Sequence, residues 1–373
     1  MRSVDVVIVG AGPAGLGMAL MLARVPDVRQ VVLEAGEVGQ SFRLWPEQTR
    51  FITPSFYSSP FGLADLNAID GASSPVVFSG TEHPSGDQYA DYLSLVADGH
   101  GLPVLTHCRV ETVVPQPGGG FVLQTSDGEL HCRFLLWATG EYQFPDLTPF
   151  PGGQWCPHYA QVRNWADRDE GPHTVIGGYE SGVDAAVQLA RLGRRVRLLA
   201  RKSTWDAAMP NDPSLSLSPF SRQRLYEALD TGHLEIVFGV DVAEVSRDEA
   251  GGYRIHAADG RHWAVSQPPI LGTGFIRGGG AHQIRELWDW TEGGQVRLSP
   301  VDESTRTPGL FLLGPQVRQE QRIYCFIYKF RQRFGLIADQ IARRLVLDAA
   351  SLQAGEGSWG PFGNTDCCEG CEC

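Results

Sequence analysis

Glycines near the start of the chain have the spacing that brings backbone N–H groups to a phosphate. The apolar run Val6–Val9 leads directly into Gly10, Gly12 and Gly15, which follow the pattern G-x-G-x-x-G. In dinucleotide-binding folds the first glycine permits a tight turn, the second lets backbone approach a pyrophosphate, and the third lets the next helix pack on the strand. The N-terminus of that helix presents free N–H groups to phosphates. We therefore expect a dinucleotide site at this loop.

An acidic residue follows the loop where a bound ribose requires one. The next apolar strand is expected over Gln30–Leu33 and ends at Glu34. A carboxylate at the end of the second strand accepts hydrogen bonds from ribose hydroxyls, and the adenosine part of FAD has them free. The aromatic-rich loop beyond Gly39–Phe42 either lines a planar ring or tucks its aromatic side chains into the core. The first site is therefore expected to hold FAD.

The same module occurs a second time. Its strand, glycine turn, helix and second strand are expected over Thr174–Ile176, Gly177–Gly182, Val183–Arg191 and Arg195–Ala200. The three glycines of the first loop correspond to Gly177, Tyr179 and Gly182, so a tyrosine replaces the middle glycine. A tyrosine here limits how closely backbone can approach a pyrophosphate.

The second module carries bases where the first carries an acid. Counting the interval from Gly10 to Glu34 onward from Gly177 reaches Arg201, and Lys202 follows it. A base at this position suits the 2′-phosphate of NADPH, although solvated charges at a strand end give the same pattern. The second site is therefore expected to take NADPH, with NADH as the alternative.

The two modules also end alike, which indicates how they are nested. Chain segments that run through a turn to Trp137–Gly140 and to Leu271–Gly274 have matching sequences. A strand over Leu310–Leu313 and a helical stretch over Ile323–Leu347 then return to complete the first module. We expect an α/β fold of two Rossmann-like three-layer domains, the NAD(P)H domain inserted in the FAD domain. The expected boundaries are 1–150 and 276–350 for the FAD domain, 151–275 for the NAD(P)H domain and 351–373 for a flexible cysteine-rich tail.

Four of the eight cysteines crowd the last seven residues, as Cys367, Cys368, Cys371 and Cys373. A pair of these thiols on a flexible arm can relay electrons by thiol–disulfide exchange. Cys368, Cys371 and Cys373 also have a spacing that can chelate Zn²⁺ or Cu(I). A disordered terminus without a role is the third interpretation. Cys325, after the return strand, is either a further redox residue near the flavin or a buried structural thiol.

Composition and charge exclude several classes of function. The formal net charge of −12 disfavours nucleic acid and anionic membranes as main partners. The chain lacks an uncharged apolar run of about 18 residues, and Asp5 interrupts any signal-like segment. Scattered cysteines without a signal indicate reduced thiols. We expect a cytoplasmic protein with no nucleic-acid or membrane partner, and a homodimer is compatible with the sequence.

The nested modules carry a family resemblance. With Ala138–Gly140 at the crossing and Gly314 on the return, they resemble the two-dinucleotide-binding-domain flavoproteins, which include thioredoxin reductases and flavin-containing monooxygenases. The segments Ala138–Pro145 and Ser181–Ala186 are similar to the monooxygenase branch. The short length, the Gly177–Gly178 loop and the run Arg333–Ala338 are similar to bacilliredoxin reductases, which reduce low-molecular-weight-thiol systems.

The chain departs from each of these groups. The segment from residue 153 to residue 274 has no C-x-x-C pair, which excludes the internal disulfide chemistry of thioredoxin reductases. Ala14 stands where bacilliredoxin reductases carry a cysteine in the first glycine loop. The monooxygenase pattern F-x-G-x-x-x-H is missing at the junction, and Pro315 replaces an aspartate that often holds the flavin ribityl chain.

The modules and the resemblance together imply an FAD-dependent NAD(P)H oxidoreductase. The leading hypothesis passes electrons from NADPH through FAD to a small-molecule, thiol/disulfide or metal-ion acceptor by way of the tail. The alternatives are a flavin monooxygenase that acts on nitrogen, sulfur or carbonyl centres, and a metal-binding or redox-sensing flavoprotein. The residues expected at the FAD site are Gly10, Gly12, Pro13, Ala14, Gly15, Glu34, Gly39, Gln40, Ser41, Phe42, Ala138, Thr139, Gly140 and Gly314. Those expected at the NADPH site are Gly177, Gly178, Tyr179, Glu180, Ser181, Gly182, Arg201, Lys202, Gly272, Thr273 and Gly274.

Overall fold

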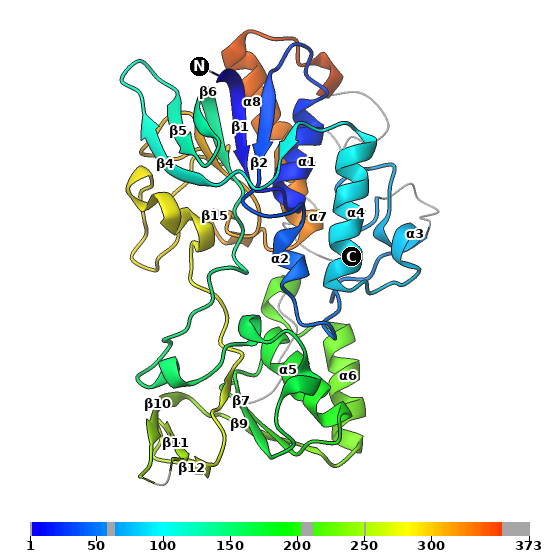
Figure 1. The fold of residues 1–373 in the computed structure, drawn as a ribbon, viewed down its shortest axis with the longest axis vertical. Coiled ribbons are helices and arrows are strands. Elements are labelled where there is room, and N and C mark those ends of the chain that lie inside the picture. Colours follow the sequence, from blue (N-terminus) through cyan, green and yellow to red (C-terminus); the bar gives the residue numbers. More distant parts are fainter. Residues whose placement is uncertain (1, 58–63, 203–211, 250, 353–373) are drawn as a thin grey trace. The chain divides into compact units, whose positions relative to one another are not determined.

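The computed structural model describes residues 2–57, 64–202, 212–249 and 251–352, which form two compact units (Figure 1). Unit 1 comprises Met1–Arg43, Pro54–Gln143 and Arg277–Cys373, and unit 2 comprises Leu44–Thr53 and Phe144–Ile276. Each unit contains parallel strands, helices and an antiparallel meander. The expected α/β fold with two Rossmann-like modules is confirmed.

Unit 1 is organised around a sheet with the strand order β3-β2-β1-β6-β5-β4, and β14 lies beside β6. The strands are β1 (Arg2–Val9), β2 (Gln30–Leu33), β3 (Val104–Leu105), β4 (Val110–Pro115), β5 (Phe121–Thr125), β6 (Gly128–Trp137) and β14 (Leu310–Leu312). The pairs β4–β5 and β5–β6 are antiparallel, and the other pairs in this sheet are parallel. Val6–Ile8 is fully buried, as expected of a strand covered on both faces. Val9 pairs with Leu33 and Trp137, so β1, β2 and β6 end at one edge of the sheet.

The helices of unit 1 begin at the points that the sequence marks. Helix α1 (Pro13–Leu22) starts directly at the glycine loop, and α4 (Gly86–Gly99) starts with a capping box between Ser85 and Gln88. A Cβ on Gly17 of α1 would lie 2.5 Å from the ring of Phe334, so α1 and α8 pack at close range. The remaining elements are α2 (Gln40–Arg43), α3 (Pro75–Ser79), β15 (Arg318–Gln319), β16 (Arg322–Ile323), α7 (Ile327–Phe330), α8 (Phe334–Leu345) and 3-10 turns at Gly279–Leu287, Arg331–Arg333 and Ala350–Leu352.

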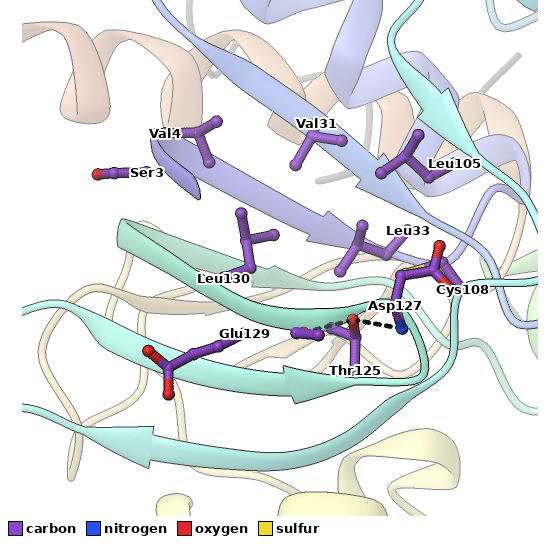
Figure 2. A pocket seen from close by; sticks show the side chains of 11 residues that line it. Ser3, Val4, Val31, Leu33, Leu105, Cys108, Thr125, Asp127, Glu129 and Leu130 are labelled. Carbon is purple, nitrogen blue, oxygen red and sulfur yellow. Dashed lines mark hydrogen bonds between the residues drawn. The ribbon is translucent and has the colours of Figure 1, made fainter. Parts of the chain in front are cut away.

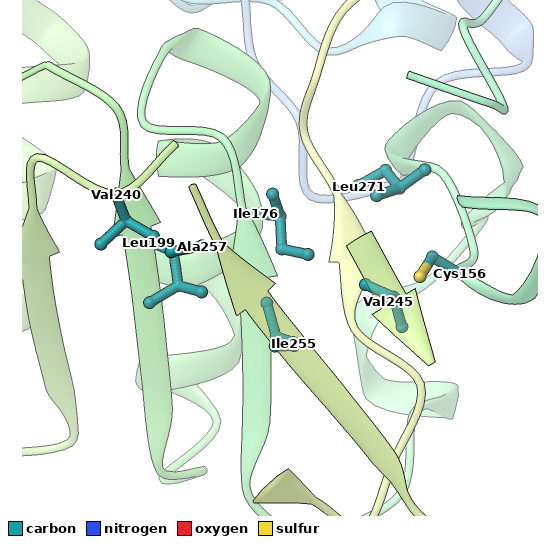
Figure 3. Packing of buried hydrophobic residues seen from close by; sticks show 8 residues of the cluster. All are labelled: Cys156, Ile176, Leu199, Val240, Val245, Ile255, Ala257 and Leu271. Carbon is teal, nitrogen blue, oxygen red and sulfur yellow. The ribbon is translucent and has the colours of Figure 1, made fainter. Parts of the chain in front are cut away.

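Unit 2 repeats this plan with fewer strands. Its parallel sheet has the order β13-β7-β8-β9, and β10, β11 and β12 form a separate meander. Figure 3 shows the core between the two sheets, where Ile176 and Leu199 meet Val245 and Ile255. The elements are β7 (His173–Ile176), α5 (Glu180–Arg191), β8 (Val196–Ala200), α6 (Pro219–Asp230), β9 (Leu234–Phe238), β10 (Val242–Arg247), β11 (Tyr253–Ala257), β12 (His262–Val265), β13 (Ile270–Leu271) and 3-10 turns at Gly153–Trp155, Tyr159–Gln161, Trp165–Asp167 and Pro213–Leu215.

One short segment belongs to unit 2 although both of its flanks belong to unit 1. Leu44–Thr53 lies inside the range 1–150 that we expected to be the first part of the FAD domain. Glu47 N donates to Arg163 O at 2.8 Å, and Gln48 Nε2 donates to Asn164 Oδ1 at 2.6 Å. These partners lie more than a hundred residues away in the chain, so the local sequence does not reveal the pairing.

Among the described ranges, no helix is both long and apolar enough to cross a membrane. The longest, α4, has 14 residues and a mixed polar and apolar sequence.

Candidate dinucleotide-binding sites

The first glycine loop has two crowded glycines and one open glycine. Gly10 has a φ of +108°, and a Cβ on it would lie 2.5 Å from Ala138 O. A Cβ on Gly15 would overlap Gly10 O. A Cβ on Gly12 would meet nothing within 4 Å, although Gly12 is the N-cap of α1. The loop therefore brings α1 against β1 and leaves open space beside the free N–H groups of the helix, which is the cradle that a pyrophosphate requires.

Glu34 lies at the end of β2 and holds the loop from the side. Its exposed fraction is 8%. Oε2 accepts from Ala11 N at 2.8 Å, and Oε1 accepts from Gly36 N at 2.9 Å. A carboxylate has about four lone-pair sites, so each oxygen keeps capacity for a ribose hydroxyl. A hydrogen-bond acceptor at this position fits the ribose hydroxyls in the adenosine part of FAD.

Residues 39–42 are packed beside this loop through different contacts. Gly39 N donates to Ala11 O at 3.0 Å, and Gln40 Oε1 accepts from Glu37 N at 3.1 Å. Ser41 Oγ accepts from Gln143 Nε2 at 3.1 Å. The ring of Phe42 packs edge-on against Tyr89, with ring centres 4.8 Å apart. The structure thus brings Gly39 to the glycine loop, whereas the side chain of Gln40 bonds to Glu37 and the ring of Phe42 packs on Tyr89.

The ends of β6 and β14 meet the same loop. Ala138 N donates to Val9 O at 2.9 Å, and a Cβ on Gly314 would lie 3.1 Å from the Cβ of Ala14. The hydroxyl of Thr139 is buried and has no hydrogen-bond partner in the described part of the chain. An unpaired buried hydroxyl costs free energy, so its presence beside the cradle is consistent with a site that is completed by a ligand.

The second glycine loop has the same backbone geometry in unit 2. Gly177 has a φ of +118°, and a Cβ on it would overlap Gly272 O. A Cβ on Gly182 would overlap Gly177 O. The hydroxyl of Thr273, like that of Thr139, is buried without a partner among the described residues. The sequence repeat therefore extends to the detail of the backbone.

Tyr179 and Glu180 of this loop contact the segment before α6. The hydroxyl of Tyr179 lies 2.5 Å from Ser216 O and 3.0 Å from Ser214 O. The carboxylate of Glu180 accepts from Ser218 N at 2.6 Å and from Ser221 Oγ at 2.5 Å. Burial raises the pKa of Glu180, and these hydrogen bonds oppose the rise. Gly178 lies in the loop between β7 and α5, and Ser181 lies in the first turn of α5.

The two expected bases lie directly after β8, and both are exposed. Lys202 Nζ donates to Leu215 O at 3.2 Å and lies 5.5 Å from the centre of the Tyr179 ring. Arg201 makes no hydrogen bond or ion pair with any residue that the structure describes. Because β7 and β8 are parallel neighbours, these bases share an edge of the sheet with the glycine loop.

Unit 2 contains a buried polar cluster around Asp184 that the sequence did not predict. Asp184 Oδ2 accepts from Tyr159 OH at 2.7 Å and from Thr49 Oγ1 at 2.9 Å, and Oδ1 accepts from Arg224 at 2.7 Å. The exposed fraction of both charged side chains is 6%. The sequence signalled Asp184 only as part of a family motif, because its partners come from three distant segments.

A second missed cluster lies beside Gly140 in unit 1. The carboxylate of Glu141 accepts a hydrogen bond from Gln316 Nε2, and Gln316 Oε1 accepts from Gly278 N at 2.8 Å. Burial raises the pKa of Glu141, while Arg318 and Gln316 oppose the rise. Glutamate and glutamine are common surface residues, so their types carried no signal.

The cysteines fall into three groups. Cys108, Cys132 and Cys156 are buried free thiols, and burial raises the pKa of Cys132 and of Cys156 to about 12. Cys325 is half-buried between β16 and α7 in unit 1. Cys367, Cys368, Cys371 and Cys373 lie outside the described residues, so the electron relay and the metal site remain predictions. Within residues 2–352 as described, no cluster of three or more metal-ligating side chains occurs.

A half-open cavity of about 270 Å³ lies elsewhere in unit 1 (Figure 2). Apolar side chains of β1 and β2, including Val4 and Leu33, face the hairpin around Asp127 across it. None of the residues expected at the FAD site lines this cavity. It is therefore distinct from the glycine loop.

Comparison with known proteins relates this geometry to characterised folds. The family model described as pyridine nucleotide-disulphide oxidoreductase matches residues 7–314. An uncharacterized CzcO-like oxidoreductase of Geobacillus kaustophilus is 28% identical over 50% of this chain, which spans about half (51%) of that relative. A bacilliredoxin reductase of Bacillus subtilis is 26% identical over 65% of this chain and 68% of its own length. A ferredoxin–NADP reductase of Granulibacter bethesdensis is 26% identical over 83% and 81%.

Solved structures show the same fold. The bacillithiol disulfide reductase of Staphylococcus aureus superposes with a TM-score of 0.72 at 21% identity, covering 92% of this chain and 99% of its own. A flavin-containing monooxygenase of Stenotrophomonas maltophilia gives a TM-score of 0.71 at 20% identity, covering 92% and 100%.

Proposed function

Because the chain belongs to the pyridine nucleotide-disulphide oxidoreductase family, we propose that it is a flavin-dependent enzyme that passes electrons from NADPH through FAD to a thiol, disulfide or metal-ion acceptor. The observation that carries the proposal is the doubled glycine loop, followed in unit 1 by Glu34 and in unit 2 by Arg201. The relatives named as bacilliredoxin reductase and ferredoxin–NADP reductase support a reductase reaction.

The residues of unit 1 provide the parts of an FAD site. The N–H groups at the start of α1 and the open space at Gly12 hold the pyrophosphate, and Glu34 accepts from the adenosine ribose. Bound FAD supplies the hydride and electron-transfer chemistry. The chain would orient the bound FAD through the turn at Gly10, which packs against Ala138 after β6, and through Gly15, which packs against Gly10.

The residues of unit 2 provide the parts of a nicotinamide-dinucleotide site. The start of α5 offers N–H groups to a pyrophosphate, and the exposed Arg201 offers a guanidinium to a 2′-phosphate. An acid in the first turn of α5 would repel these phosphates. The carboxylate of Glu180 is instead turned to Ser218 and Ser221, whose N–H and O–H groups donate to it, so its negative charge is directed away from the phosphates.

The state of the thiols supports an acceptor reached through the tail. Thiol–disulfide exchange requires a thiolate. With pKa values of about 12, Cys132 and Cys156 hold almost no thiolate at neutral pH. Cys108 is buried as well, so Cys325 and the four tail cysteines are the remaining candidates. The tail thiols lie in a glycine-rich and serine-rich sequence that suits a carrier arm.

An anaerobic assay tests the acceptor. Deleting Asp366–Cys373 should abolish NADPH oxidation coupled to a low-molecular-weight disulfide or to Cu²⁺, while oxidation coupled to ferricyanide continues at the wild-type rate. Cys325→Ser in the full chain is the matched control for the other accessible thiol. Unchanged disulfide turnover in the deletion variant would rule out the tail as electron carrier.

The monooxygenase alternative rests on the segment Ala138–Pro145 and on the missing C-x-x-C pair between residues 153 and 274. It predicts that NADPH oxidation requires oxygen together with an organic amine, sulfide or ketone. Incorporation of one ¹⁸O atom from ¹⁸O₂ into such a substrate, with no turnover under argon, would establish this function in place of the reductase.

A further inference from the structure

Of the three glycine positions of the motif, the second loop differs from the first at one, where Tyr179 replaces the glycine and is built into its surroundings. At Gly12 of the first loop a Cβ would meet nothing within 4 Å. Tyr179, at the equivalent position, has a φ of −121° and a ψ of −167°, an extended conformation that any residue adopts. Its ring extends from the loop, and its hydroxyl is fixed between the carbonyl oxygens of Ser214 and Ser216 at 3.0 and 2.5 Å. The tyrosine is therefore anchored at both ends.

The anchored ring faces one of the two bases. Lys202 Nζ lies 5.5 Å from the ring centre, within the range of a cation–π contact. The same ammonium donates to Leu215 O at 3.2 Å, a carbonyl between the two that bind the tyrosine hydroxyl. Among the described residues this ammonium donates to no other acceptor, so two further N–H donors stay available there. The ring and the segment 214–216 thus restrict an exposed lysine at the end of β8.

The neighbouring residue stiffens the same segment. The carboxylate of Glu180 binds Ser218 N at 2.6 Å and Ser221 Oγ at 2.5 Å. Two consecutive residues of the glycine loop therefore fasten residues 214–221 to the start of α5. The carbonyl groups that hold Tyr179 and Lys202 belong to this fastened segment.

We propose that Tyr179 is a positioning residue that holds Lys202 at the ribose end of the second dinucleotide site and so increases the preference for a dinucleotide with a 2′-phosphate. The proposal rests on the proposed role of unit 2 as the nicotinamide-dinucleotide site. A lysine that is already restricted loses less conformational entropy when it binds a phosphate. Arg201, which has no partner among the described residues, contacts the 2′-phosphate without such support.

Calorimetric titration of the FAD-loaded protein with adenosine 2′,5′-bisphosphate and with AMP tests the proposal. These probes differ in the 2′-phosphate and undergo no redox reaction. Wild-type protein should bind the bisphosphate about tenfold more tightly or better. Tyr179→Ala should reduce this ratio by about three- to tenfold and leave AMP affinity within about twofold. Tyr179→Phe, which keeps the ring and loses the hydroxyl anchor, should give an intermediate ratio.

The variants of the lysine separate positioning from general damage. Lys202→Ala should lower the ratio at least as much, and the double variant Tyr179→Ala/Lys202→Ala should be no worse than Lys202→Ala, because both changes remove one interaction. Tyr226→Phe, at an exposed tyrosine of α6, is the control. Equal losses of bisphosphate and AMP affinity in Tyr179→Ala and Tyr179→Phe, or additive losses in the double variant, would overturn the proposal. Equal binding of both probes by wild-type protein would instead refute the NADPH site itself.

Discussion

Gly12 and Gly15 belong to one motif and have opposite surroundings. A Cβ on Gly15 would overlap Gly10 O, whereas a Cβ on Gly12 would meet nothing, and the φ of −86° at Gly12 suits any residue. We predict that Gly12→Val folds with the melting temperature of the wild-type apoprotein and loses most of its FAD. Gly15→Val should fail to fold because the backbone has to move. The ratio of released flavin to protein and the apoprotein melting curve measure the two effects.

The buried thiols allow a second prediction at the residue scale. Cys108, Cys132 and Cys156 are buried, and Cys325 is half-buried. In a variant without Asp366–Cys373, the thiol reagent DTNB should modify at most one cysteine of the native protein within minutes and all four after denaturation. Cys325→Ser should then remove the one fast-reacting thiol. Two or more fast thiols in the native variant would contradict the packing of β6 and of the Gly153–Trp155 turn.

At the scale of elements, a buried ion pair joins α5 to α6. Arg224 and Asp184 are each 6% exposed, and Asp184 also binds Thr49 and Tyr159. Removing one partner leaves a buried charge, so we predict that Arg224→Met lowers the free energy of unfolding by about 3–5 kcal/mol. Urea unfolding of the wild-type and variant proteins measures this loss.

The same two helices supply a matched control for this prediction. Arg191 of α5 pairs with Glu227 of α6 at 2.9 Å, but these side chains are 43% and 52% exposed. Arg191→Met should cost less than about 1 kcal/mol because solvent screens an exposed pair. Similar losses in both variants would show that burial does not set the strength of the α5–α6 pairing.

The extents of several elements depend on contacts that are remote in sequence. Apolar residues recur over Val104–Val114 as they do in a strand, but the chain turns at His107, whose φ is +56°, and forms β3 and β4 at opposite edges of the sheet. The helical stretch expected over Ile323–Leu347 begins only at Ile327, since Ile323 pairs in the hairpin with β15. Both regions contain the type of element that their apolar periodicity indicates, and tertiary pairing decides where each element begins.

At the scale of the whole molecule, two buried histidines make stability depend on pH, and both lie in unit 2. His158 Nε2 donates to Gly274 O at 2.9 Å, and Nδ1 accepts from Ala160 N at 3.1 Å, so the ring is neutral. Burial lowers the pKa of His158 and of His173 from 6.5. The two histidines therefore bind protons in the unfolded chain that they do not bind in the folded chain, and their contribution to the free energy of unfolding falls as pH decreases below about 6.5.

The measurement isolates one histidine. Burial raises the pKa of Glu141, Glu180 and Asp302, which opposes the histidine effect as pH falls, so the pH profiles of two proteins that both contain these carboxyl groups must be compared. His158→Asn keeps an acceptor for Ala160 N and cannot be protonated. Between pH 7.5 and 5.5, wild-type protein should lose more unfolding free energy than this variant. Parallel profiles would show that His158 does not titrate differently on folding.

The sequence alone determined the two modules and their nesting. These predictions rest on local patterns: the glycine spacings, the acid or base after the second strand, and the repeated strand ends. Such patterns are visible in the sequence because a tight turn accepts only certain residue types at fixed positions. They led to the correct fold class and family. The assignment of FAD and NADPH to these loops stays a prediction that rests on the same residues.

Only the tertiary structure decided which side chains surround those loops. Asp184 meets Thr49, Tyr159 and Arg224, and Lys202 meets the ring of Tyr179, although these residues are separated by 23 to 135 positions. No periodicity or motif spacing in a single sequence indicates contacts between residues so far apart. The physical reason is that packing energy depends on distance in space, whereas a motif records only distance along the chain.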